Sequence, residues 1–192
     1  MKRPILTITI SMSCILMTAM APLFDSSIYG INGHPTLWMS FMPSNPLRLL
    51  GLGLITSPFL HINLEHLIVN TFFLVPIAMI IERKYSSLYL LKLFFSLHAL
   101  VLLQLVLVDT FFQLNGKSFL GCSHIVIGIY SYYFTHEKKF GLLAIPFTVI
   151  LLGAWQGQGV LTTLAHTLGL ASGVCAVYLN IFFNSLRSNR PN

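Results

Sequence analysis

The chain has 192 residues, of which 55% are hydrophobic and only 8% are charged. A soluble domain carries about 25% charged residues, so this composition excludes a soluble fold. Eleven Lys and Arg against five Asp and Glu give a net charge of +6, but no block of like charges forms a stripe for nucleic acid. We therefore expect a single all-α transmembrane domain over residues 1–192, with lipid rather than nucleic acid around it.

Six apolar stretches have roughly the length that a helix needs to cross a bilayer, which is about 20 residues at 1.5 Å per residue. The predicted spans are Pro4 to Phe24, Phe59 to Ile81, Ser87 to Val108, Phe119 to Phe134, Phe140 to Trp155 and Leu161 to Phe183. The fourth and fifth spans are short. A short span fits a helix that begins below the membrane surface inside a protein-lined cavity.

The basic residues predict the orientation of these spans. With a cytoplasmic N-terminus, nine of the eleven basic residues lie on the inner side, and Arg48 and Lys117 are the exceptions. Both termini are therefore expected in the cytoplasm. The segment from Asp25 to Pro58 becomes a long outer loop whose apolar residues favour a position in the membrane interface. These residues include Trp38, Met39, Phe41 and Met42.

Three polar clusters lie within the predicted spans, where ionisable side chains are costly and mark candidate functional sites. The second span opens with HINLEHLIVN, in which His66 and Asn70 are four residues apart and share one helical face. The fourth span begins with GCSH, which contains Ser123. The sixth contains AHTLGLASG, which contains His166. Three separate helices thus carry polar groups that could meet.

The depths of these groups overlap. Counted at 1.5 Å per residue from the inner ends of their spans, His66 lies at about 22 Å, Asn70 and Ser123 at about 16 Å, and His166 at about 26 Å. All four fall between the middle of the bilayer and its outer surface.

Small residues suggest how the fourth and sixth spans meet. Gly169 and Gly173 follow His166 on the same helical face and permit a close approach of two backbones. Gly121 and Gly128 offer a matching surface on the fourth span. This pairing would allow a hydrogen bond between the serine and the histidine.

Such a pair suits acyl transfer. A serine hydroxyl becomes a nucleophile when a nearby neutral imidazole takes its proton. Asn70, His66 and the backbone N–H groups around Cys122 could donate to the oxyanion of the intermediate. We find no carboxylate within the spans to orient His166, so a dyad is expected rather than a triad.

The motifs His-x4-His-x3-Asn, Gly-x-Ser and Ala-His-x2-Gly-x3-Gly, in this order and on these spans, resemble those of rhomboid intramembrane serine proteases. The family's fold is a six-helix bundle. Its members cleave transmembrane or juxtamembrane segments of single-span or C-terminally anchored membrane proteins, so the resemblance implies a reaction with no metal and no cofactor. Glu82-Arg83 is similar to an acidic-basic pair often found at the inner end of the second helix. The resemblance implies a bacterial inner membrane, with the active site opening to the outer side.

The resemblance also implies a role for each residue. Ser123 would be the nucleophile and His166 the general base and then acid, while His66, Asn70 and the Cys122 N–H would form the oxyanion hole. His61 would be a supporting polar residue at the cavity mouth. Three glycines would support the geometry, namely Gly121, Gly169 and Gly173.

Some positions depart from the family pattern. His124 stands where many members have glycine, and Ile127 where an aromatic residue often stacks on the base. A Trp-Arg pair common in the first outer loop is missing near Leu52 and Gly53. A glycine five residues after the serine, here Gly128, resembles the pattern of the rhombosortase branch, which processes C-terminal Gly-Gly anchors.

Two other functions stay open. One is a catalytically inactive rhomboid-like protein that binds transmembrane helices, and the other is a small transporter that uses histidines as a proton relay. His124 could be a polar group of the cavity or a turn residue. His98 and Gln104 are expected to be packing residues, because they lie on different faces of the third span. Substrate entry is expected beside the fifth span.

Overall fold

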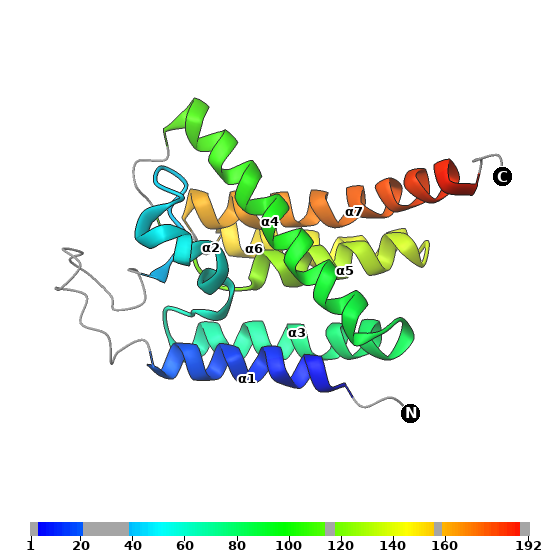
Figure 1. Ribbon diagram of the computed structural model, residues 1–192, viewed down its shortest axis with the longest axis horizontal. Helices are drawn as coiled ribbons and strands as arrows, with labels where there is room; N and C mark the ends of the chain where they lie inside the picture. Colours follow the sequence, from blue (N-terminus) through cyan, green and yellow to red (C-terminus); the bar gives the residue numbers. More distant parts are fainter. Residues whose placement is uncertain (1–3, 21–38, 114–117, 156–158, 189–192) are drawn as a thin grey trace.

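The computed structural model describes residues 4–20, 39–113, 118–155 and 159–188, and these residues form a helical bundle (Figure 1). A single antiparallel bridge between Phe41 and Phe119 is the only β pairing within these ranges. The helices are α1 (Ile5–Met20), α2 (Leu52–Thr56), α3 (Leu64–Lys84), α4 (Ser87–Phe112), α5 (Ser123–His136), α6 (Ala144–Trp155) and α7 (Val160–Ser188). Short 3₁₀ turns are η4 (Arg48–Gly51), η5 (Ser57–Phe59) and η6 (Phe140–Leu143).

Three helices in the described part of the chain are long and apolar enough to cross a membrane: Leu64–Lys84, Ser87–Phe112 and Val160–Asn180. Two further apolar helices, Ile5–Met20 and Phe140–Trp155, are shorter. The count of six spans therefore stays a prediction. In Figure 1, the first residues of α1 and the last residues of α7 lie at the same end of the bundle, and α2 lies at the opposite end.

The first residues of α3 and α5 are set by local interactions, and they lie a few residues after the starts of the predicted spans. α3 begins at Leu64 because the side chain of Asn63 accepts a hydrogen bond from the His66 N–H at 2.8 Å. α5 begins at Ser123 rather than Phe119, because Gly121 has a φ of +97°, which a helix cannot contain. Phe119 instead pairs with Phe41 through backbone bonds of 2.9 and 2.7 Å. The nucleophile candidate is thus the first residue of its helix.

The segment between α1 and α3, which we predict to be an outer loop, packs against the helices over its described residues. Phe41 is 1% exposed and lies among α4 and α7 residues such as Val101 and Ala165. Met39 is also buried, next to Leu60. The bundle therefore covers these two side chains, and the position of the loop in the membrane interface stays a prediction. Trp38 lies outside the described residues.

Glu82 joins three helices at the end of the bundle that holds the α1 N-terminus. Its carboxylate is 2% exposed and accepts hydrogen bonds from the Leu6 N–H and the Thr7 N–H, both at 2.9 Å. The Thr7 and Ser87 hydroxyls each donate to it at 2.7 Å. A buried carboxylate is costly unless its lone pairs are satisfied, and four donors satisfy this one. Glu82 therefore holds α1, α3 and the start of α4 together.

Glycines let α5 and α7 pack backbone against backbone, as the small-residue pattern predicts. A Cβ atom on Gly169 would lie 2.3 Å from the His124 carbonyl oxygen, and one on Gly173 would lie 2.1 Å from the Gly128 carbonyl oxygen. Real Cβ atoms do not approach so closely, so only glycine fits at either position. This packing brings the start of α5 beside the first half of α7.

Candidate active site

Ser123 and His166 meet where α5 begins. The Oγ atom of Ser123 lies 2.7 Å from the Nε2 atom of His166, which is the distance of a strong O–H···N hydrogen bond. His166 is 5% exposed, and its Nδ1 atom has no hydrogen-bond partner among the described residues. The arrangement is a serine–histidine pair, without a described third group to orient the imidazole.

His66 and Asn70 lie on α3 beside the turn that precedes Ser123. A Cβ atom on Gly121 would lie 2.9 Å from Cε1 of His66 and 3.5 Å from Nδ2 of Asn70, so the turn touches both side chains. The Asn70 Nδ2 and His66 Nδ1 atoms are buried and have no partner within the described ranges. The Asn70 amide nitrogen can therefore donate to an acceptor in the cavity beside it.

A cavity of about 290 Å³ connects these groups. Ser123, His166, His66 and Asn70 all line it. Apolar side chains from α3, α5 and α6 form the rest of the wall, namely Val69, Phe73, Val126, Ile127, Ile145, Pro146 and Val149. The α6 residues belong to the fifth predicted span, so the cavity lies beside the span at which we expect substrate entry.

Two polar residues of the cavity wall were not anticipated from the sequence. Thr162 lines the cavity from α7, and Tyr130 lines it from α5. Thr162 is four residues before His166 and shares its helical face, which is the signal that could have identified it. Tyr130 is seven residues after Ser123 and shares a face with it in the same way.

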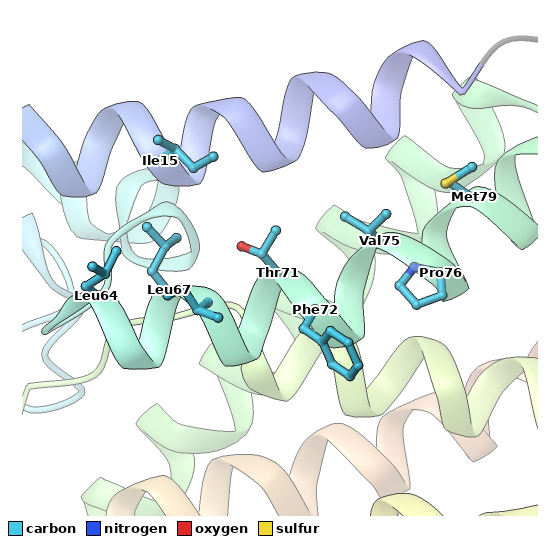
Figure 2. Close-up of a pocket in the computed structure, with 9 residues that line it drawn as sticks. Ile15, Leu64, Leu67, Thr71, Phe72, Val75, Pro76 and Met79 are labelled. Atoms are coloured by element: carbon cyan, nitrogen blue, oxygen red, sulfur yellow. The ribbon is translucent and has the colours of Figure 1, made fainter.

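A larger cavity of about 730 Å³ lies along α3, where α1 contributes Ile15 (Figure 2). Among the described residues that line it, Thr71 is the only polar one and none is titratable. An apolar groove on a membrane helix has no group that could activate a nucleophile. We therefore take the smaller cavity as the candidate site.

His61 is placed differently from the prediction. Its side chain is 1% exposed, does not line the cavity, and packs edge-on against the His66 ring at 5.1 Å between centroids. Its Nδ1 atom is 3.4 Å from the Thr18 hydroxyl, and its Nε2 atom is 3.8 Å from the Cys122 sulfur. The expectation of a residue at the cavity mouth is wrong, because α1 covers His61 and places it behind His66.

The structure also resolves the open question of His124. Its side chain is fully buried and absent from the cavity wall, and its Nε2 atom lies 2.9 Å from Nδ1 of His98 on α4. Gln104 accepts a hydrogen bond from the Ser172 hydroxyl at 3.1 Å. His98 and Gln104 thus serve helix packing, as predicted, although through hydrogen bonds rather than apolar contact.

The apolar helices and the polar groups enclosed among them define an integral membrane protein with a serine and a histidine in contact beside an apolar cavity. A family model described as the Rhomboid domain matches residues 51–182, more than half of the chain. The chain therefore belongs to the rhomboid family. This family consists generally of serine intramembrane proteases that act on membrane proteins within the bilayer, and it includes inactive homologues. A search of curated proteins found no match.

Proposed function

We propose that the protein is an intramembrane serine endopeptidase that works with a Ser123–His166 dyad. The observation that carries this proposal is the 2.7 Å contact between Ser123 Oγ and His166 Nε2 at a cavity that also exposes Asn70. A hydroxyl beside a neutral imidazole is the arrangement from which nucleophilic acyl transfer starts.

The geometry suggests the following sequence of steps. The Ser123 hydroxyl donates its hydrogen bond to His166 Nε2, which takes the proton as the oxygen attacks a peptide carbonyl. The oxyanion accepts hydrogen bonds from Asn70 Nδ2, from His66 and from N–H groups at the start of α5, where the helix dipole is also favourable. His166 then protonates the departing amine. Water, deprotonated by the same imidazole, hydrolyses the acyl-enzyme ester and releases Ser123.

The surroundings of the cavity support a substrate that arrives through the bilayer. Apart from His66 and Asn70, its walls from α3 and α6 are apolar, and a transmembrane or juxtamembrane segment of an anchored protein could lie between them. We further propose six spans, with both termini in the cytoplasm of a bacterial cell and a site that opens to the outer side. A C-terminal Gly-Gly anchor is a more specific substrate proposal, tested by comparing such an anchor with an ordinary single-span substrate.

The test compares the wild type with Ser123→Ala in liposomes. We expect the wild type to react with a fluorophosphonate probe and to cleave a model membrane substrate, and Ser123→Ala to do neither while inserting normally. The matched control is Ser131→Ala, which removes a buried α5 hydroxyl that bonds to the Ile127 carbonyl away from the cavity. Cleavage retained by Ser123→Ala would overturn the proposal.

An inactive homologue that binds transmembrane helices is the second candidate. The observation that favours it is Ile127 at the cavity wall, where the family often has an aromatic ring against the base. In that case the wild type would not react with the probe, yet it would still retain single-span proteins during purification from membranes.

A further inference from the structure

The outer-loop helix α2 has a backbone carbonyl that it cannot satisfy by itself. In an α-helix, the Leu54 carbonyl would accept from the N–H four residues later, but that residue is Pro58, which has none. The neighbouring Ser57 N–H bonds to the Gly53 carbonyl instead. An orphan carbonyl within a membrane bundle needs another donor.

His98 supplies that donor from α4. Its Nε2 atom lies 2.9 Å from the Leu54 oxygen, and its side chain is 2% exposed. A carbonyl oxygen only accepts, so Nε2 of His98 carries the hydrogen. The Nδ1 atom of neutral His98 is then an acceptor, and the Nε2–H of His124 donates to it across 2.9 Å. The hydrogen-bond network therefore assigns one tautomer to each ring.

His124 is held from several sides. Its carbonyl oxygen is in backbone contact with Gly169 of α7, and its ring packs against Phe119 at 4.8 Å between centroids. Gly121, two residues before Ser123, also contacts the segment that contains α2, because its N–H donates to the Ser57 carbonyl at 2.8 Å. The backbone on either side of Ser123 is thus connected to the segment that contains α2.

We propose that His98 and His124 form a positioning pair that ties α2 to the residue next to the nucleophile and so keeps Ser123 in register with His166. This role rests on the proposed function. Neither ring lines the cavity, so the pair acts through Ser123 rather than on the substrate. His124, which stands where many family members have glycine, then has a structural role through its hydrogen bond to His98 and does not by itself indicate an inactive site.

The test uses the full chain in detergent micelles with two readouts. The first is hydrogen exchange of the amides of residues 52–57, which does not depend on catalysis. The second is the rate at which the fluorophosphonate probe labels Ser123, with kcat and KM for a model substrate. We expect His98→Leu to accelerate the exchange roughly tenfold. We expect it to slow labelling roughly 10- to 100-fold, with KM changed less than about twofold.

A double variant and a conservative variant distinguish a positioning role of the two histidines from a role in packing alone. Because both histidines belong to one chain of hydrogen bonds, the double variant of His98→Leu and His124→Leu should be no slower than the worse single variant. His124→Gln keeps a donor near the Nε2 position and should label within about threefold of the wild type. The control is Gln104→Leu, which removes an α4 hydrogen bond to Ser172 outside the pair and should leave both readouts unchanged.

A third variant covers the case in which the leucine variants do not fold. His98→Gln keeps a donor near the Nε2 position for the Leu54 carbonyl but leaves no atom at the Nδ1 position to accept from His124, so exchange in α2 should stay near the wild-type rate while labelling slows. Unchanged exchange and labelling in folded leucine variants, or additive losses, would overturn the positioning pair. A wild type that neither labels nor cleaves would overturn the proposed function and the catalytic role of the pair, while the exchange rates still decide whether the pair holds α2.

Discussion

At the scale of single residues, Asn70 offers the sharpest test of oxyanion stabilisation. Its Nδ2 atom is buried at the cavity and has no acceptor among the described residues. Removing one oxyanion donor typically lowers kcat by about 10² to 10³, so we expect a loss of this size in Asn70→Ala. The measurement is kcat with a model membrane substrate, together with labelling of Ser123.

Asn63→Ala is the matched control, because it truncates another asparagine of the same helix. This side chain caps α3, and its loss should lower the free energy of unfolding by about 1 kcal/mol and leave kcat unchanged. Equal kcat in Asn70→Ala and the wild type would rule out Asn70 as an oxyanion donor.

The contact between Ser123 and His166 could be predicted from the sequence, but the contacts of His61 and His124 could not. Ser123 and His166 could be paired from helix periodicity and depth, since both quantities depend only on residue spacing. The position of His61 could not, because it depends on how α1 covers the loop before α3. The partner of His124 was equally out of reach, because the pairing depends on the orphan carbonyl that Pro58 leaves in a short helix the sequence did not indicate.

At the scale of helices, the contact of α5 with α7 determines the geometry of the dyad. Gly173→Ala would place a Cβ atom 2.1 Å from the Gly128 carbonyl oxygen, so the two helices must separate. Overpacking of this kind costs about 1 to 3 kcal/mol, which the better helix propensity of alanine offsets only in part. We expect a lower free energy of unfolding and a lower kcat, measured by unfolding in mixed micelles and by cleavage.

Gly141→Ala is the control for this prediction, because a Cβ atom there meets nothing within 4 Å. This variant should unfold and cleave like the wild type. A Gly173→Ala protein with unchanged stability would mean that the two helices are not in backbone contact.

Helix bounds were predictable to within a few residues, since runs of apolar residues mark them. The start of α3 at Leu64 and the irregular turn before α5 could not be read in this way. Both depend on single residues, such as the Asn63 cap and the positive φ of Gly121, which interrupt an otherwise apolar run.

At the scale of the whole molecule, one exposed ion pair connects two helix ends and predicts a pH effect. Lys84 Nζ lies 2.5 Å from Glu137 Oε1, and this hydrogen bond lowers the pKa of Glu137 from its ordinary 4.5 to about 2. A carboxylate with a depressed folded-state pKa stabilises the fold above its unfolded pKa, and this contribution is lost as the pH falls from 4.5 towards 2.

The check compares the wild type with Glu137→Gln by thermal unfolding across that range. The wild type should be the more stable protein at the upper end, and the difference should shrink as the pH falls. Because the pair is partly exposed, the difference should also shrink in high salt. A gap between the two proteins that does not depend on pH would contradict the ion pair.

The shortness of α5 has a consequence for where a substrate would be cut. Its 14 residues rise about 21 Å, whereas the hydrocarbon core is about 30 Å thick. In the proposed orientation, with His136 at the inner boundary of the core, Ser123 would lie about 9 Å below the outer boundary, which corresponds to about six residues of a substrate helix. The depth of the first turn of α5 would therefore determine the position of the cut in the substrate helix. Mass spectrometry of the products should place the cut near that depth, and lengthening the substrate helix at its inner end should leave the cut site unmoved.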